Sequence, residues 1–156
     1  MYNIMIKFTQ PELLIQTFII TALWDVVLRI MSENYNMLPN FLQMDFVKYL
    51  IPYFKQHTVL SAAVIAGVVG SITQYIIIKV VPFPNNIMDI NYVIKFLFVS
   101  FVISGLFGFP MKFSKLFPHL ERTYYDKLGP TNGIIHDGVS GIIVQMTLLG
   151  LYHMKN

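Results

Sequence analysis

Four stretches of the chain are apolar enough, and about long enough, to cross a lipid bilayer. They are Leu13–Met31, Leu60–Val81, Ile90–Phe109 and Ile134–Tyr152. A transmembrane helix needs about 20 predominantly apolar residues, and lipid offers the backbone no hydrogen-bond partners, so each stretch must be helical. The sequence therefore predicts an all-α polytopic membrane protein, with residues 1–156 forming one domain of four transmembrane helices packed as a compact bundle.

The composition agrees with a membrane protein and excludes several classes of function. Hydrophobic residues make up 55% of the chain and charged residues 12%, which is about half the charged share of a typical soluble domain. The absence of cysteine excludes thiolate catalysis, disulfide exchange and cysteine-ligated metals. The sequence also lacks a basic cluster, a glycine-rich phosphate loop and a histidine–glutamate metal motif. We therefore expect no nucleic-acid partner, no cofactor and no metal ion.

Two longer connectors, 32–59 and 110–133, join the predicted spans. Within them, Phe41–Phe54 and Phe113–Leu128 mix large apolar and aromatic groups with charged ones, a mixture typical of a short helix lying in the membrane surface. Such helices can simply cover one end of the bundle, or one of them can dock a protein partner, and the sequence leaves both interpretations open. The run Gly129–Gly133 predicts a break before the fourth span.

Lysine and arginine are distributed unevenly around the four spans. With an even number of spans, both connectors lie on one side of the membrane and both termini on the other, and the connectors carry most of the basic residues. Cytoplasmic loops are enriched in Lys and Arg, so we expect the connectors on the cytoplasmic side, or its equivalent, and both termini on the opposite side. The connectors would then bind a partner layer, or anionic lipid, partly through charge.

Each predicted span carries small or polar residues on one face. Helices gain no hydrophobic energy by associating in lipid, so they pack through small residues that allow close approach and through hydrogen bonds between helices. We predict that the following small residues pack helix against helix: Ala63, Gly67, Ser71, Ser100, Ser104, Gly108 and Gly141. We predict that the following residues form a polar seam inside the bundle: Thr17, Thr21, Gln74, His136, Asp137 and Gln145.

Asp25 and Arg29 lie one helical turn apart within the first span. A lone ionised carboxylate in a bilayer costs at least about 2.5 kcal/mol, whereas an acid followed four residues later by a base forms a stabilising pair. We therefore expect a buried ion pair between them. The alternative is a proton- or ion-handling site with Asp25 as the binding carboxylate. At the start of the fourth span, the helix dipole favours the Asp137 carboxylate, and His136 is suited to sensing pH.

One short motif inside the fourth span invites comparison with an enzyme family. The run Gly138-Val139-Ser140-Gly141 has the form G-x-S-G and resembles the nucleophile motif of rhomboid-type intramembrane serine proteases. This resemblance implies Ser140 as the nucleophile. It covers four residues, whereas rhomboid cores have six spans and a partner histidine within a separate span. In this chain the four histidines lie in the connectors or on the same span as the serine. Helix packing explains these small residues better.

These features favour a non-catalytic protein over an enzyme. We expect a structural or assembly component of a membrane complex, with a protein partner docking on the connectors and a homo-oligomer as a further option. The residues Phe, Ile, Asn, Lys and Tyr, whose codons are AT-rich, are abundant. The internal membrane of a large DNA virus, beneath its capsid, is therefore one setting, and an organellar membrane is another. The alternative function is a small transporter or channel subunit that uses the polar seam around Asp25 and Asp137.

Overall fold

The regular structure is entirely helical in the part of the chain that the computed structural model describes. That part comprises residues 9–44, 47, 48, 51, 54, 55, 58–112 and 122–155, with the backbone alone described for 108–112, 122–130 and 132. The long helices are α1 (Gln10–Glu33), α3 (Val59–Val80), α4 (Ile90–Lys112) and α5 (Arg122–Lys155), and two short 3-10 turns, Tyr35–Met37 and Asn40–Leu42, follow α1. Each long helix contains a segment long and apolar enough to cross a membrane. The predicted all-α fold with four candidate spans is therefore confirmed.

Side-chain caps explain where the first two long helices begin. At α1, the Thr9 hydroxyl accepts a hydrogen bond from the Glu12 backbone N–H at 3.4 Å, and the Glu12 carboxylate accepts one from the Thr9 N–H at 2.9 Å. At α3, the Thr58 hydroxyl accepts from the Ser61 N–H at 3.1 Å. These bonds satisfy backbone donors that the first turn of a helix leaves without intrahelical partners.

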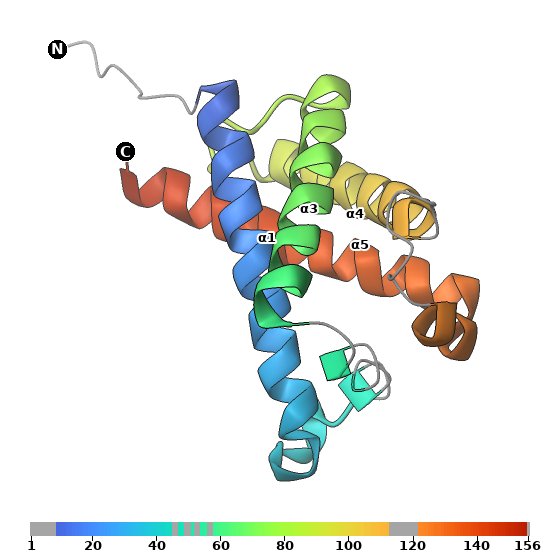
Figure 1. Cartoon of the computed structure of the whole chain (residues 1–156). Helices are drawn as coiled ribbons and strands as arrows, with labels where there is room; N and C mark the ends of the chain where they lie inside the picture. Colours follow the sequence, from blue (N-terminus) through green and yellow to red (C-terminus); the bar gives the residue numbers. More distant parts are fainter. Residues whose placement is uncertain are drawn as a thin grey trace, which may run out of the picture.

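The four helices form two antiparallel pairs. α1 packs chiefly against α3, and α4 chiefly against α5. Figure 1 shows the α4–α5 pair lying across the α1–α3 pair. α1 begins and α5 ends at the same end of the molecule, where Lys155 Nζ lies 3.6 Å from Glu12 Oε1. The candidate spans contain 18 to 24 residues and are therefore about 27–36 Å long, which is comparable to a hydrocarbon core about 30 Å thick.

The helices around the second connector extend beyond the predicted spans. α4 continues to Lys112 and α5 begins at Arg122, so the predicted break at Gly129–Gly133 is wrong and this segment is helical. Membrane helices tolerate glycine and proline because neighbouring groups and local adjustments satisfy the freed backbone atoms. Residues 113–121, which belong to the surface helix predicted for this connector, lie outside the described part of the chain.

The first connector is buried at two of its described apolar positions, Val47 and Phe54, while others remain exposed. The exposed fractions of Val47 and Phe54 are 0% and 2%. The Arg29 guanidinium lies 5.6 Å from the centroid of the Phe54 ring, which is a cation–π contact. Lys48 and Lys55, each next to one of the buried residues, are exposed. The connector therefore covers the end of α1 with its apolar groups and presents its lysines to the surroundings.

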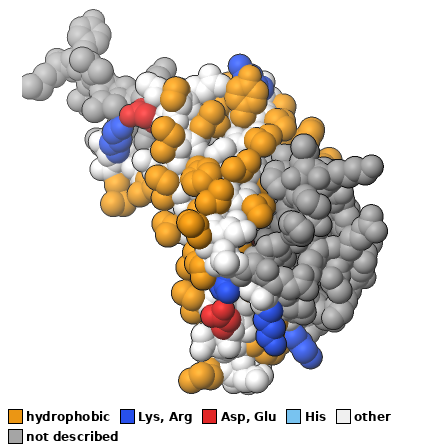
Figure 2. Space-filling model, in the orientation of Figure 1, with side chains coloured by type: hydrophobic (Ala, Val, Ile, Leu, Met, Phe, Trp, Pro, Cys, Tyr) orange, Lys and Arg blue, Asp and Glu red, His pale blue; other side chains and the backbone are white. Residues whose placement is uncertain are grey.

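Apolar side chains fill the interior and also cover the outer faces. One buried cluster consists of Ile77, Val81, Phe96, Ile103 and Leu149, and a second of Leu13, Val144 and Leu148. On the outside of α1, Ile15, Ile19 and Leu23 are between 45% and 59% exposed. On the face shown in Figure 2, hydrophobic side chains cover the middle and charged side chains gather at the two ends. This is the surface expected of a multi-pass membrane protein.

Candidate functional site

A pair of buried glutamines joins the two helix pairs inside the bundle. Gln74 of α3 and Gln145 of α5 have exposed fractions of 0% and 2%. Gln145 Nε2 donates a hydrogen bond to Gln74 Oε1. The second polar atom of each amide, Gln74 Nε2 and Gln145 Oε1, makes no hydrogen bond to the described residues. Both glutamines belong to the predicted polar seam, and the structure brings them into direct contact.

The threonines of the seam bond within their own helices. The Thr17 hydroxyl donates to the Leu13 carbonyl at 2.7 Å, and the Thr21 hydroxyl donates to the Thr17 carbonyl at 2.7 Å. Thr73, which the sequence did not single out, is also buried and donates to the Val69 carbonyl at 2.8 Å. A hydroxyl that bonds to the preceding turn satisfies its own donor. These residues can therefore lie in an apolar interior without a polar partner on another helix.

Two further polar side chains form hydrogen bonds between helices. Ser71 of α3 donates through its hydroxyl to the Leu14 carbonyl of α1 at 3.0 Å. Trp24 Nε1 of α1 donates to the Ser140 hydroxyl of α5 at 3.3 Å. Ser140 is the serine of the rhomboid-like motif, and here its oxygen accepts a hydrogen bond from an indole. The role of Trp24 was missed because its partner is 116 residues away and no local spacing connects them.

Glycines of α3 allow α1 to approach closely. A Cβ added at Gly67 would lie 2.7 Å from Phe18 Cε2, and one added at Gly70 would lie 2.8 Å from Thr21 Cβ. Protein interiors are close-packed, so neither position has room for a methyl group unless the Phe18 or Thr21 side chain of α1 moves. Gly67 is one of the predicted packing residues, and the structure places it at the α1–α3 contact.

Glycines serve the same purpose between α4 and α5. A Cβ added at Gly138 would lie 2.7 Å from Phe101 Cδ2, and one added at Gly105 would lie 2.8 Å from the Ile134 carbonyl oxygen. Gly141 faces the Ser104 side chain, which would meet any added Cβ. The prediction that Gly141 and Ser104 are packing residues agrees with this contact. Gly138 belongs to the G-x-S-G motif, whose small residues were attributed to helix packing, whereas Gly105 had not been singled out.

The other predicted packing residues are Ser100 and Gly108 of α4 and Ala63 of α3. Ser100 is fully buried and donates its hydroxyl hydrogen to the Phe96 carbonyl at 2.7 Å, within α4. Ala63 is half-buried, while its neighbour Ala62 has an exposed fraction of 0%. Gly108 lies in α4, but its surroundings fall outside the described part of the chain.

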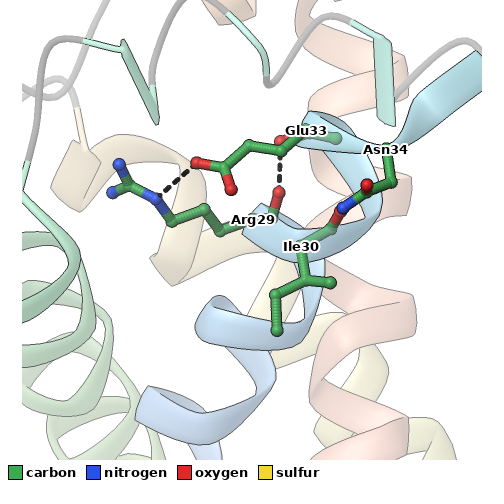
Figure 3. Close-up of polar contacts among 5 residues, drawn as sticks. Arg29, Ile30, Glu33 and Asn34 are labelled. Carbon is green, nitrogen blue, oxygen red and sulfur yellow. Dashed lines mark hydrogen bonds and ion pairs between the residues drawn. The ribbon is translucent and has the colours of Figure 1, made fainter.

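Arg29 forms an ion pair with Glu33, which lies one helical turn after it in α1. Its Nε lies 3.0 Å from Glu33 Oε1, and Figure 3 shows the two side chains pointing toward each other. Glu33 lies just beyond the predicted end of the first span, which is why the sequence analysis passed over it. Asp25 is half-buried. Its pairing with Arg29 stays a prediction, as does its alternative role as an ion-binding carboxylate.

Asp137 is buried and His136 is half-buried. Because α5 begins at Arg122, both residues lie deep inside a helix and not in its first turn. The helix dipole acts within the first and last turns, so the dipole explanation offered for Asp137 does not apply. Asp137 instead precedes Gln145 by eight residues, about two turns of the same helix, and therefore lies on the same side of α5.

The residues described in the structure contain no group of three or more His, Asp or Glu side chains arranged to hold a metal ion. Comparison with family models, curated proteins and solved structures finds no match for this chain. The fold itself therefore defines the class: this is a multi-pass helical membrane protein. Its interior threonines bond within their own helices, and Gln74, Gln145, Ser71 and Trp24 bond to neighbouring helices.

Proposed function

We propose that this protein is a non-catalytic structural or assembly component of a membrane complex. The observation that carries the proposal is that the polar and small residues of the interior hold helices together. The Gln74–Gln145 and Trp24–Ser140 hydrogen bonds join helices of different pairs. The glycines bring the helices of each pair into close contact. Bonds and contacts of this kind are what stabilises helix association in lipid, and a stable platform is what a scaffold requires.

The first connector supplies a surface suited to a protein partner. Met37, Phe41 and Met44 are apolar yet 84%, 73% and 47% exposed, and they lie beyond the end of α1 and outside the candidate spans. The exposed Lys48 and Lys55 follow in the same connector. Methionine and aromatic side chains are enriched in protein interfaces, and the lysines favour a partner with an acidic rim.

The positive-inside tendency places this connector on the cytoplasmic side, with the ends of the chain across the membrane. The protein would then attach a membrane to the protein layer that faces it. The AT-rich codon bias favours the internal membrane of a large DNA virus, beneath its capsid, as the setting, and an organellar membrane complex is the alternative setting.

Site-specific photocrosslinking in the native membrane tests the proposal. A photoreactive residue at position 41 should capture one defined protein, and charge reversal by Lys48→Glu and Lys55→Glu should weaken that capture. Met88 provides the matched control, because it is 80% exposed in the α3–α4 connector at the opposite end of the span. Equal capture from positions 41 and 88, or capture that ignores both charge reversals, would contradict docking at the first connector.

A small transporter or channel subunit is the second candidate, and a different observation favours it. The buried amides of Gln74 and Gln145 each keep one polar atom without a hydrogen bond to the described residues, and buried Asp137 lies on the same side of α5 as Gln145. The two unbonded amide atoms could bind water along a hydrated path, and ionisable residues inside spans mark such paths. A flux assay in liposomes, comparing the parent with Asp25→Asn, distinguishes the two functions. Flux that depends on Asp25 supports transport, and absence of flux with intact partner capture supports the scaffold.

A further inference from the structure

A cleft of about 280 Å³ lies at the end of the molecule where α1 begins and α5 ends. Gln10, Lys79 and Asn85 form its polar rim, and Leu13, Phe83 and Tyr152 form its apolar floor. These residues come from α1, α3, the α3–α4 connector and α5. The volume is close to the lower limit of about 300 Å³ for small-molecule sites. It therefore suits the headgroup and the adjoining upper chain of one lipid, with the rest of the lipid lying outside the cleft.

The floor of the cleft is held in place by aromatic packing. The Phe83 ring meets the Phe96 ring edge to face, with 5.5 Å between centroids, and meets the Tyr152 ring in the same way at 5.6 Å. Edge-to-face packing is a favoured geometry of aromatic pairs. Leu13 belongs to a buried apolar cluster against which Phe83 also packs. The apolar floor is thus preformed, and a ligand does not have to order it.

The rim of the cleft carries positive charge. Lys79 is exposed in the last turn of α3, where its ammonium lies 5.2 Å from the centroid of the Tyr75 ring. No carboxylate among the described residues pairs with Lys79, and no acidic residue lines the cleft. The exposed side-chain amides of Gln10 and Asn85 add hydrogen-bond donors beside this cation.

The position of the cleft identifies the kind of ligand. Gln10 is the first residue of α1, and Lys79 precedes the last residue of α3, so the cleft lies where the spans leave the hydrocarbon core. At that depth a phospholipid presents its charged phosphate, and the apolar acyl chains begin just below the glycerol esters. We propose that this cleft binds one anionic phospholipid, with Lys79 pairing with the phosphate and Phe83 and Tyr152 contacting the upper acyl chain. The apolar floor favours the lipid over free phosphate.

Native mass spectrometry of the purified full chain tests this inference with three probes: phosphatidylglycerol, phosphatidylcholine and inorganic phosphate. The parent should retain one phosphatidylglycerol in preference to phosphatidylcholine. Lys79→Met should weaken phosphatidylglycerol binding about fivefold, the effect of roughly one basic residue near an anionic surface. Lys95→Met is the matched control, because Lys95 is also exposed, near the start of α4, but lies outside the cleft. It should leave binding unchanged.

A second variant tests the same cleft without removing a lysine. Asn85→Asp adds a negative charge to an exposed rim position and should lower the preference for phosphatidylglycerol by repelling the lipid phosphate. Equal losses in Lys79→Met and Lys95→Met would overturn the site and indicate attraction to surface charge in general. Displacement of the lipid by inorganic phosphate at the same concentration would overturn the lipid as the occupant, and so would equal retention of the two lipids.

Discussion

Removing one member of the Gln74–Gln145 pair is expected to destabilise the protein as much as removing both. The two amides are buried and hydrogen-bonded to each other between α3 and α5. Methionine is an unbranched side chain of similar length without an amide, so Gln74→Met, Gln145→Met and the double variant remove polar groups while largely keeping volume. Each single variant leaves the other amide buried with no partner from this pair.

The magnitudes follow from the two terms involved. The lost hydrogen bond between membrane helices contributes about 1 kcal/mol, and the orphaned buried amide costs at least about 1 kcal/mol more. Each single variant is therefore expected to lose about 2 kcal/mol of unfolding free energy. The double variant leaves no orphaned amide and is expected to lose no more than a single variant. The resulting coupling energy is about 2 kcal/mol, within the range for contacting residues.

Unfolding in mixed micelles by titration with sodium dodecyl sulfate provides the measurement. Trp24 is the single tryptophan of the chain, and its indole, on α1, bonds to Ser140 of α5, so its fluorescence reports separation of these helices. Gln16→Met serves as the control, because Gln16 is half-buried and makes no side-chain hydrogen bond to the described residues. It should lose little or no stability. Additive losses, with the double variant losing twice as much as each single one, would refute the proposed contact between the amides.

Three further substitutions test a helix contact, a hydrogen bond between helices and a helix cap. Gly105→Ala should lower the unfolding free energy by about 1–3 kcal/mol in the same titration, because its Cβ would meet a backbone carbonyl oxygen of α5 at 2.8 Å. Gly150→Ala is the control, because its Cβ would meet nothing within 4 Å. It should be neutral or stabilising by up to about 1 kcal/mol. The reverse order would contradict the α4–α5 contact. Ser140→Ala removes the acceptor for Trp24 and should shift the tryptophan emission while partner capture persists; loss of biological activity with an unchanged fold would instead favour the protease interpretation. Thr9→Ala removes the cap of α1 and should speed amide hydrogen exchange in its first turn, at a cost of about 1 kcal/mol; unchanged exchange would show that the cap is not formed.

Local pattern in the sequence was sufficient to predict four candidate spans and to place Gln74 and Gln145 on inward faces. Hydropathy locates a span because the bilayer requires a fixed apolar length, and residues four apart share a helix face whatever the tertiary structure. Gln74, Gln145 and Gly67 were therefore identifiable as inward-facing. Their particular neighbours were not, because contacts between helices depend on how the α4–α5 pair crosses the α1–α3 pair. The hydrogen bond between Trp24 and Ser140 is an example.

The errors have a common physical origin in how helix ends were judged. The break predicted at Gly129–Gly133 relied on the poor helix propensity of glycine and proline in water, but α5 runs through this segment. The dipole explanation for Asp137 depended on the same supposed helix start. At the end of the first span, hydropathy ended the helix before Glu33, although α1 includes it and Arg29 pairs with it.

The central claim is that four helices cross a bilayer with their polar faces turned inward, and cysteine accessibility tests it most directly. The chain has no cysteine of its own, so single cysteines can be introduced without background labelling. In sealed vesicles, Ile19→Cys on the outer face of α1 should resist a membrane-impermeant maleimide. Met37→Cys should react from one side of the membrane and Met88→Cys from the other. Rapid labelling of Ile19→Cys, or labelling of Met37→Cys and Met88→Cys from the same side, would contradict the account.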